Sequence, residues 1–305
     1  MARDPSELYD LASDVPALED VVLVQALDGF VDAGAAKRLA REHLMTAHGS
    51  RVLATFDVDA LLDYRSRRPT MTFDAGAWQS YDEPELVIDL LRDDEGAPLL
   101  LMHGLEPDLY WERFVAAVRT VIEDFGVTTT IGVHGIPMGV PHTRPVTVTA
   151  HATRGELIAA HPNFFSAVQV PASAAALLEL RLGQEGRDAL GFAANVPHYL
   201  AQNEYPQAAA ELVRQISRTT GLSLPLGDLE AAGAKVLAEI DRQVEGSEEV
   251  SAVVHALEVQ FDSFAEATGH DQRASLLARS EELPSADELG AQFEAYLAGQ
   301  DSDGD

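Results

Sequence analysis

Residues 21–27 of this chain, Val-Val-Leu-Val-Gln-Ala-Leu, give the clearest indication of its fold class. They form a short apolar run, rich in β-branched residues and followed by Asp28, which is typical of a buried strand. Apolar residues then recur at helical spacing over 33–44, with Asp32 placed to cap the helix. Because residues 52–56 have the composition of another strand, this segment predicts a strand–helix–strand unit of a largely parallel sheet.

The alternation of strands and helices continues to about residue 220. Apolar and β-branched runs predict strands at 99–102, 128–133, 146–149 and 189–196. Helical spacing of apolar residues predicts helices at 109–125, 172–182 and 208–219. Two weaker strand-like stretches within 70–91 make a mixed sheet as acceptable as a purely parallel one.

A linker at 221–227, which contains glycine and proline, separates this pattern from an all-helical one. Three apolar stripes follow at helical spacing, in residues 229–244, 253–264 and 289–297. Each stripe needs a partner surface to cover it, whereas the last six residues are polar and are expected to be disordered. The predicted organisation is an α/β domain at 1–222, a helical region at 228–299 and an acidic tail at 300–305.

The chain of 305 residues carries 21 Lys and Arg against 50 Asp and Glu, a formal net charge of −29. Such a polyanion repels phosphate backbones and anionic bilayers, so neither nucleic acid nor a membrane is expected as a partner. Cysteine is absent, which excludes disulfides, thiolate nucleophiles and Cys-based zinc sites. With no signal-peptide pattern and no apolar run of the ~20 residues that cross a bilayer, a cytoplasmic location is expected.

Acidic residues follow two of the predicted strands at the end where open α/β sheets bind ligands. Asp28 and Asp32 come after the first strand, and Glu106 comes after the strand at 99–102. The two aspartates suit cation binding or proton transfer, but they equally suit a turn residue and a helix cap. Strand-to-helix turns use Gly, Asp and Pro in any case, so a pocket and ordinary turns are both consistent with the pattern.

Residues 140–145, Val-Pro-His-Thr-Arg-Pro, predict a rigid loop, because proline fixes φ and removes a hydrogen-bond donor. His142, Thr143 and Arg144 in this loop are a candidate site for an anionic ligand, since a guanidinium binds carboxylate or phosphate in bidentate fashion. The alternative is that Arg144 pairs with carboxylates of the chain itself and locks the loop.

Residues 196–199, Val-Pro-His-Tyr, form a second segment of this kind. His198 is a candidate general acid or base near neutral pH, with Tyr199 beside it as a candidate ligand-binding group. A histidine beside a tyrosine is more often simply hydrogen-bonded in place, and this interpretation stays open.

Basic residues cluster at 64–69, Tyr-Arg-Ser-Arg-Arg-Pro. Arg65, Arg67 and Arg68 are candidates for docking an acidic partner, a neighbouring subunit or the chain's own carboxylates. The sequence contains no Gly-x-Ser-x-Gly, Gly-x-x-x-x-Gly-Lys-Ser/Thr or His-Glu-x-x-His pattern, and no Gly-x-Gly-x-x-Gly loop follows the first strand. No cofactor or metal is therefore predicted, and an enzyme is the less expected class.

Taken together, these motifs resemble the proteasome assembly chaperone family in its actinobacterial branch. The similar segments keep their order along nearly the whole chain, at 28–34, 56–59, 64–69, 104–108 with Trp111, 141–145, 197–199 with 205–206, and 283–289. The resemblance implies a three-layer α/β/α fold with a mostly parallel or mixed sheet, like that of phosphorylase/hydrolase-like proteins, and a C-terminal helical extension. It also implies a homo-oligomer, with a trimer as the leading arrangement, and partners related to the proteasome. It supplies no catalytic residues.

Some relatives dock onto proteasome rings through a C-terminal hydrophobic-Tyr-x tail, whereas residues 303–305 here are Asp-Gly-Asp. Docking by that route is not expected. The predicted function is a non-enzymatic, assembly-chaperone-like or protein-interaction role. The alternative is a phosphorylase/hydrolase-like enzyme acting on a small anionic metabolite, with a pocket lined by Asp28, Glu106, His142, Arg144 and His198. Catalysis would require these side chains to lie within hydrogen-bond reach of one cleft.

Overall fold

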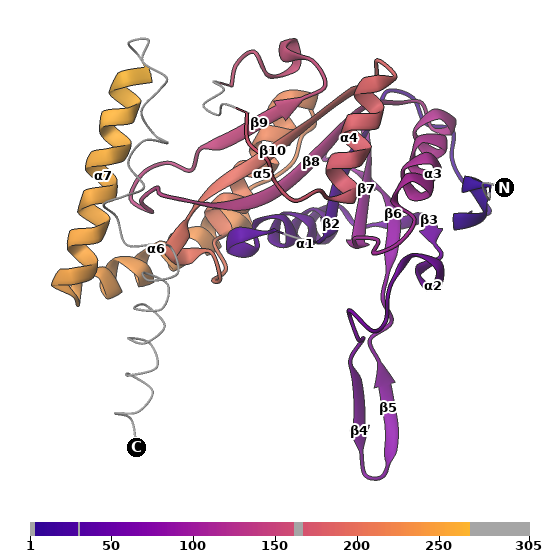
Figure 1. The fold of residues 1–305 in the computed structure, drawn as a ribbon, viewed down its shortest axis with the longest axis horizontal. Helices are drawn as coiled ribbons and strands as arrows, with labels where there is room; N and C mark the ends of the chain where they lie inside the picture. The colour runs from indigo at the N-terminus through magenta and orange to yellow at the C-terminus, as the bar shows by residue number, and fades with distance from the viewer. Residues whose placement is uncertain (1–3, 30, 162–166, 269–305) are drawn as a thin grey trace.

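The computed structural model describes residues 4–29, 31–161 and 167–268. Within these residues eight strands form one sheet: β1 (Tyr9–Leu11), β2 (Val21–Asp28), β3 (Arg51–Phe56), β6 (Leu86–Arg92), β7 (Pro98–Leu105), β8 (Val127–Met138), β9 (Val148–Ala152) and β10 (Asp188–Pro197). Their order across the sheet is β1-β3-β6-β7-β2-β8-β10-β9 (Figure 1).

The sheet is mixed. Its centre consists of the parallel neighbours β7, β2, β8 and β10. On one side of this centre the pairing is antiparallel: β6 pairs with β7, β3 with β6, and β1 with β3. On the other side β9 pairs antiparallel with β10. The strand–helix–strand unit predicted at 21–56 is present, but its two strands are not neighbours, because β7 and β6 lie between β2 and β3.

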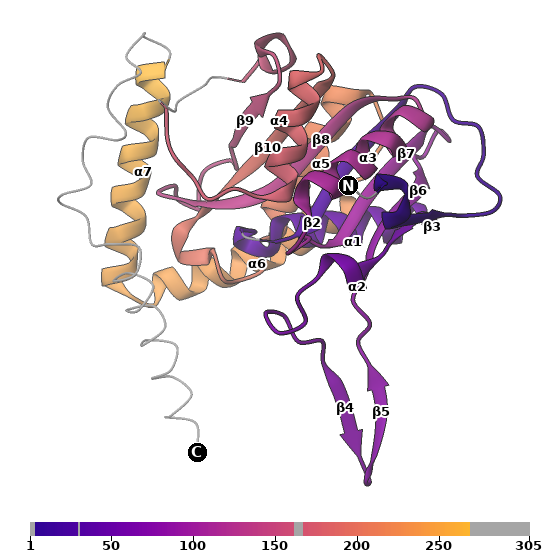
Figure 2. The ribbon, with the colours of Figure 1, turned by 45° about the vertical axis from the view of Figure 1, so that its right-hand side comes forward.

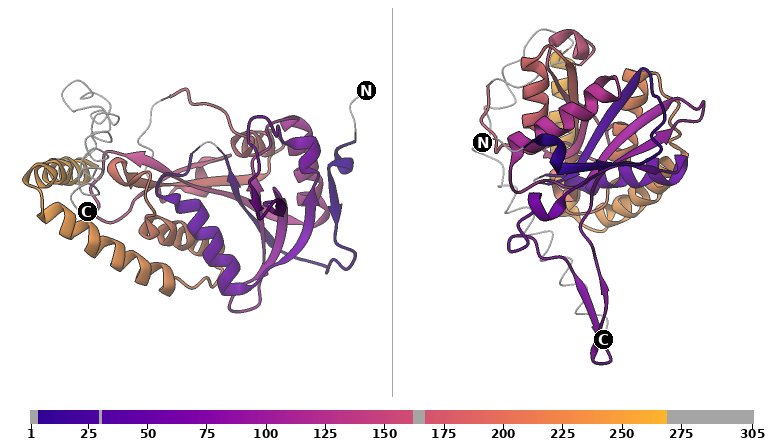
Figure 3. Two further views of the ribbon diagram at one scale, coloured as in Figure 1. Left: turned by 90° about the horizontal axis from the view of Figure 1, so that it is seen from below. Right: turned by 90° about the vertical axis from the view of Figure 1, so that its right-hand side faces the viewer.

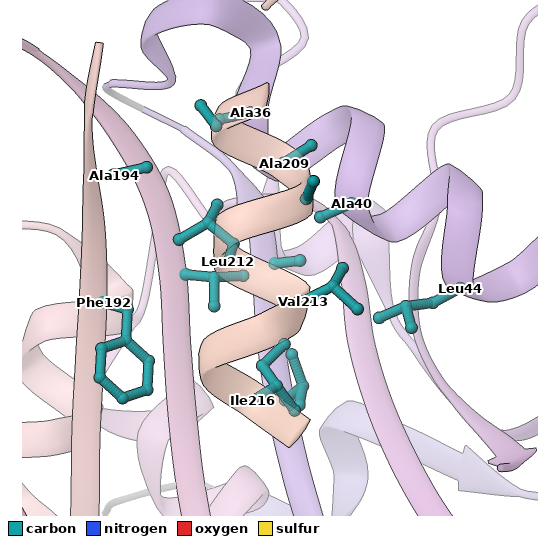
Figure 4. Packing of buried hydrophobic residues seen from close by; sticks show 14 of the residues in the cluster. Ala36, Ala40, Leu44, Phe192, Ala194, Ala209, Leu212, Val213 and Ile216 are labelled. Carbon is teal, nitrogen blue, oxygen red and sulfur yellow. The ribbon is translucent and has the colours of Figure 1, made fainter. Parts of the chain in front are cut away.

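Helices cover both faces of the sheet, which gives the predicted three-layer α/β/α fold (Figures 1 and 3). On one face lie α1 (Ala36–His48) and α5 (Pro206–Thr220), and on the other lie α3 (Trp111–Asp124) and α4 (Ala174–Gln184). Figure 4 shows how α1 and α5 pack beside each other. Small residues such as Ala36, Ala40 and Ala209 let the two helices approach, while Leu212 and Ile216 are completely buried.

The opposite core is organised around aromatic rings. Phe114 of α3 is completely buried and meets Phe56 of β3 edge to face, with ring centroids 5.2 Å apart. Leu178 and Leu182 bring α4 into the same cluster. Successive side chains of the strands point alternately into the two cores, as expected for a sheet that is buried on both faces.

The sequence predicts a strand at 128–133, but β8 continues to Met138. The extension has a partner, because parallel pairing with β10 runs through Met138 opposite Pro197. On its other side β8 pairs with β2 only as far as Gly132. Pro137 therefore lies where one edge of β8 is unpaired, and a residue without an N–H group is tolerated there.

Two helices extend the α/β body, α6 (Gly227–Glu245) and α7 (Glu248–Thr268). Leu229 and Ile240 join α6 to the core beneath α5, and α7 packs against α6 (Figures 1 and 2). The predicted linker at 221–227 is itself docked, since Leu224 is buried. The stripe at 289–297 and the tail at 300–305 lie outside the described residues. None of the described helices is both long enough and apolar enough to cross a membrane.

A two-stranded hairpin of β4 (Met71–Asp74) and β5 (Ala77–Tyr81) stands away from the body (Figure 2). It pairs with none of the strands of the main sheet, and all of its strand residues are exposed. The sequence pattern indicated strands in this region but not their separation from the sheet. The remaining elements of the described residues are short helical turns: η1 (Pro5–Leu8), η2 (Ala33–Ala35), α2 (Val58–Leu61), η3 (Gly155–Ile158) and η4 (His198–Leu200).

Candidate functional site at the carboxyl edge of the sheet

The candidate residues lie where the parallel strands β2, β7, β8 and β10 end. Asp28 is the last residue of β2, and Asp32 follows that strand. Asp28 forms an ion pair with Arg41 of α1, with 2.6 Å between Oδ2 and Nη1. Asp32 accepts three backbone N–H bonds, from Lys37 at 2.8 Å, Arg38 at 3.1 Å and Gly135 at 3.1 Å. Asp32 therefore caps the start of α1 and ties it to β8, and each aspartate has partners that stabilise its charge.

Glu106 is a buried carboxylate that joins β7 to the opposite helical layer. Its Oε1 accepts the backbone N–H of Ala174 at 2.5 Å, at the first residue of α4. A negative charge is favourable at a helix N-terminus. Gly29 lies directly against this carboxylate, and a Cβ there would be 2.2 Å from Oε2. The Asp-Gly turn after β2 is thus required by the position of Glu106.

Arg67 holds this part of the edge together. Its guanidinium donates to the carbonyl oxygens of Asp28 and Glu106, at 3.4 and 2.5 Å, and forms an ion pair with Asp108. Arg67 is therefore engaged by the chain's own oxygens. The side chains of Arg65 and Arg68 are exposed and form no ion pair with the residues that the structure describes.

His142 lies at a buried junction between the proline-rich loop, η4 and α6. Its backbone N–H donates to the hydroxyl of Tyr199 at 2.9 Å, and its Nδ1 lies 2.7 Å from the same hydroxyl. Its Nε2 lies 3.2 Å from the carboxylate of Asp241. Burial raises the pKa of Tyr199 above its ordinary value, so the hydroxyl keeps its proton at neutral pH.

Thr143 and Arg144 bind α7. The hydroxyl of Thr143 donates to Glu258 at 2.5 Å, and Arg144 makes a bidentate contact with Asp262 through Nε at 2.8 Å and Nη2 at 2.6 Å. Arg144 also lies 3.2 Å from Glu258. The hydrogen bonds from Thr143 and Arg144 lower the pKa values of Glu258 and Asp262, respectively. Arg144 thus pairs with carboxylates of its own chain. We call this set the latch: His142, Thr143, Arg144, Tyr199, Asp241, Glu258 and Asp262.

His198 lies beside the latch. Its ring meets that of Tyr199 edge to face at a centroid distance of 5.4 Å. Burial lowers the pKa of His198, and a hydrogen bond to the backbone of Met138 opposes this effect. The imidazole is therefore held mainly neutral at pH 7 by its surroundings.

The structure brings the predicted residues together in two separate groups. Asp28 and Glu106 share Arg67, whereas His142, Thr143, Arg144, His198 and Tyr199 gather at the latch. Among the described side chains, no hydrogen bond or ion pair links one group directly to the other. The acidic members of the latch, Asp241, Glu258 and Asp262, were not predicted. In a chain with 50 carboxylates, no single one carries a signal in the sequence.

The described residues contain no cluster of three or more His, Asp and Glu side chains arranged to hold a metal ion. The carboxylates at this edge bind instead to guanidinium and backbone N–H groups, as set out above.

His134 lies inside β8, and acidification is expected to weaken the fold through this residue. Burial, together with the charges of His151 and Lys37, lowers its pKa from 6.5 to about 4. Between these values only the unfolded chain takes up the proton, so stability is lost as the pH falls from 6.5 toward 4. In urea unfolding at about pH 7 and about pH 5, the native chain should lose about 2 kcal/mol more than the His134→Gln variant. Equal losses in the two proteins would contradict this assignment.

The sequence and the fold of this chain are similar to those of known proteins. The sequence profile of the PAC2 family matches residues 26–244. A Mycobacterium tuberculosis protein of unknown function is 49% identical, with a TM-score of 0.82 over 88% of this chain and 92% of that one. A Corynebacterium glutamicum protein of unknown function is 38% identical, with a TM-score of 0.80 over 85% of this chain and 99% of that one.

A further similar structure carries a functional description. It is a proteasome-assembly chaperone homologue from Mycobacterium tuberculosis, 26% identical, with a TM-score of 0.70 over 77% of this chain and 99% of that one. No curated protein sequence matches the chain. The profile match spans most of the sequence, from β2 to the end of α6, and the similar structures share the fold. This chain is therefore a member of the PAC2 family.

Proposed function

We propose that this protein is a non-enzymatic interaction protein that assists proteasome assembly in the cytoplasm and works as a homo-oligomer, with a trimer as the leading arrangement. Membership of the PAC2 family supports the proposal, as does similarity to a protein described as a proteasome-assembly chaperone homologue. The absence of cysteine is consistent with a reducing compartment.

The hairpin of β4 and β5 is the observation that carries the interaction role. Four of its large apolar side chains are exposed: Met71 at 47%, Phe73 at 59%, Trp78 at 64% and Tyr81 at 46%. Phe73 and Trp78 meet edge to face, with ring centroids 5.1 Å apart, and thus form one aromatic knob. An isolated two-stranded hairpin is marginally stable in water, and exposed aromatic side chains are enriched at protein interfaces. The hairpin is therefore shaped for burial against a protein surface.

A second copy of this chain is the partner that fits the hairpin. Arg65 and Arg68 precede β4 and are exposed without an ion pair among the described residues. A chain with a net charge of −29 offers an acidic surface to these guanidinium groups. Aromatic anchors beside complementary charges are the combination that protein interfaces use.

The polar side chains at the carboxyl edge favour a non-enzymatic role. Arg144 and His142 are occupied by the latch, Glu106 binds the start of α4, and Asp28 binds Arg41. Each has a structural partner, and together they form two groups rather than one convergent set. This arrangement offers less to a phosphorylase-like or hydrolase-like reaction than to a rigid, interaction-bearing edge.

Replacing both Phe73 and Trp78 by serine is expected to convert the oligomer to monomer at micromolar concentration. Each aromatic anchor contributes about 2 kcal/mol, so the loss of both, about 4 kcal/mol, should raise the dissociation constant about a thousandfold. Light scattering coupled to size exclusion measures the change. Leu180→Ser is the matched control, because Leu180 is exposed to a similar degree, at 55%, but lies on α4. A native chain that is monomeric at this concentration would refute the oligomer, and an unchanged mass of the double variant would refute the role of the hairpin.

The assembly role is tested by co-expression with the α and β subunits of the proteasome of the same organism. Native electrophoresis should show a complex that contains this protein and a larger fraction of assembled rings than without it. A variant with Arg144→Ala and Thr143→Ala reports whether the latch takes part, independently of oligomer formation. If neither subunit co-purifies with the protein and the assembled fraction is unchanged, the assembly role is wrong.

A further inference from the structure

Exposed aromatic and basic side chains surround the base of the hairpin of β4 and β5. Tyr81 at the end of β5 is 46% exposed, while Leu109 and Tyr110, just before α3, are 45% and 60% exposed. The pKa of Tyr64 is raised by its hydrogen bond to Asp59 and, less strongly, by Tyr81, so the two tyrosines are neighbours. We call this set the base patch: Tyr64, Arg65, Arg68, Tyr81, Leu109 and Tyr110.

Hydrogen bonds hold the two chain segments of the base patch together. The N–H groups of Asp108 and Leu109 both donate to the carbonyl oxygen of Leu61, at 2.9 and 3.0 Å. The carboxylate of Asp108 accepts the N–H group of Asp63 at 2.9 Å. The basic turn at 61–68 is thereby fixed to the loop that precedes α3, so the two segments form one surface.

Tyr110 is held at this surface by a strained backbone. Its φ of +55° is a left-handed conformation that a bulky residue rarely adopts. The indole N–H group of Trp111 donates to the carbonyl oxygen of Pro107 at 2.6 Å and closes the turn around Tyr110. Such strain persists where the surrounding structure imposes it, and it gathers at functional sites. A tyrosine that is fixed in this way loses little conformational freedom when a partner covers it.

Two arginines of the base patch are available to an acidic partner. Arg65 and Arg68 are exposed, and neither has a carboxylate partner within the ranges that the structure describes. Two nearby carboxylates are engaged, Asp59 by the hydroxyl of Tyr64 and Asp63 by the backbone N–H group of Arg65 at 2.9 Å. Arginine and tyrosine are enriched among the residues that dominate interface binding energies. The base patch therefore suits an acidic segment that also offers apolar side chains.

The C-terminal part of the sequence has the complementary composition. Residues 281–305 contain eight Asp and Glu and no Lys or Arg. Within them lies the apolar stripe at 289–297, which needs a partner surface. The described residues end with α7 at Thr268, and α7 and the hairpin lie on different sides of the body (Figures 1 and 2). The segment would have to pass around its own body to reach its own hairpin, whereas the hairpin of a neighbouring copy has no such restriction.

We propose that the base patch binds residues 281–299 of a second copy of this chain. The apolar stripe covers Leu109 and the tyrosines, and the flanking carboxylates pair with Arg65 and Arg68. Charge complementarity directs the segment to this surface, and burial of the tyrosine rings adds affinity. The proposal rests on the homo-oligomer proposed above and names the part of the second copy that the hairpin region receives. Such a contact joins two different surfaces, and it closes into a ring when the rotation between copies allows.

Photo-cross-linking from position 296 tests this proposal in the full-length chain. Tyr296 is replaced by the photoreactive residue p-benzoylphenylalanine, and the protein is irradiated at micromolar concentration. Denaturing electrophoresis distinguishes the products, because only a cross-link between two chains doubles the mass. Peptide mass spectrometry of the two-chain product is expected to find position 296 linked to residues 64–81 or 109–110.

Arg65→Glu combined with Arg68→Glu should lower the yield of the two-chain product about tenfold or more, because like charges then face each other. Arg154→Glu combined with Arg242→Glu is the matched control. It changes the net charge by the same amount at exposed positions, after β9 and on α6, and should leave the yield unchanged.

Two variants in the segment itself check the other side of the contact. Phe293→Ser should lower the yield about tenfold or more, whereas Gln292→Ser, off the apolar stripe, should leave it unchanged. Light scattering on the same samples separates this proposal from the oligomer itself, because a monomeric native chain refutes both. In an oligomeric chain, this proposal alone is overturned by the absence of a two-chain product at residues 64–81 or 109–110. An unchanged yield in the arginine double variant or in Phe293→Ser overturns it equally.

Discussion

Replacement of Gly104 by alanine is expected to lower the melting temperature by about 10 °C. Gly104 has φ +108°, which side-chain-bearing residues rarely adopt, and a Cβ there would lie 2.0 Å from the carbonyl oxygen of Glu85. That oxygen cannot retreat easily, because it accepts the N–H of Leu105 at 2.9 Å at the start of β6. Backbone strain and overpacking together cost about 3–5 kcal/mol, and each kcal/mol corresponds to about 2–4 °C in a domain of this size.

Two other glycines separate the causes of this loss. Gly96 has φ +88° but open space around it, so Gly96→Ala measures strain without a clash. Gly139 has neither constraint, so Gly139→Ala should be nearly neutral. In thermal melts followed by circular dichroism, Gly139→Ala should have the highest melting temperature of the three variants, Gly96→Ala an intermediate one and Gly104→Ala the lowest. If Gly104→Ala and Gly139→Ala have the same melting temperature, the junction of β6 and β7 is less rigid than described.

Tyr199→Phe is expected to destabilise the protein by about 2–4 kcal/mol and to loosen the latch. The lost hydroxyl is the partner of both the backbone N–H and Nδ1 of His142, which is 4% exposed. Each buried polar group left without a partner costs about 1–3 kcal/mol. Hydrogen–deuterium exchange should show faster exchange in residues 140–145 and in α7, while β2 and β7 stay protected.

Tyr64→Phe is the matched control for this substitution. Its hydroxyl donates to Asp59 at 2.6 Å, but the pair is exposed, so water replaces the lost bond at little cost. A loss in Tyr199→Phe no greater than in the control would mean that the hydroxyl does not support His142. Unchanged exchange in α7 would mean that the loop and the helix are held independently.

The parts of the fold that were predictable from sequence are those set by local periodicity. The run at 21–27 predicted β2, and apolar spacing predicted α1, α3, α5 and the two described C-terminal helices to within a few residues. The register and length of β8 were not predictable, because its extension to Met138 depends on pairing with β10, some 60 residues later. The separation of the hairpin from the sheet is likewise a matter of partners rather than of strand propensity.

The candidate site shows the same division. Proline and histidine in 140–145 indicated a stiff loop, and the loop is indeed fixed. The acids that fix it, Asp241, Glu258 and Asp262, come from helices whose sequence signal was apolar spacing alone. The sequence supports two interpretations of Arg144, and only three-dimensional contacts distinguish between them, because an ion pair between residues 118 positions apart has no local sequence pattern.

The distance in sequence between Arg144 and Asp262 affects the order in which the parts of the molecule form during translation. Arg144 leaves the ribosome 118 residues ahead of Asp262, which is about 6–24 s at 5–20 residues per second. The α/β/α body can collapse in that interval, before the loop at 140–145 can pair with Glu258 and Asp262. Contacts of such high sequence separation are the slowest to close. The nascent chain therefore passes through a stage in which Arg144 has no carboxylate partner from α7, and this stage ends when α7 docks.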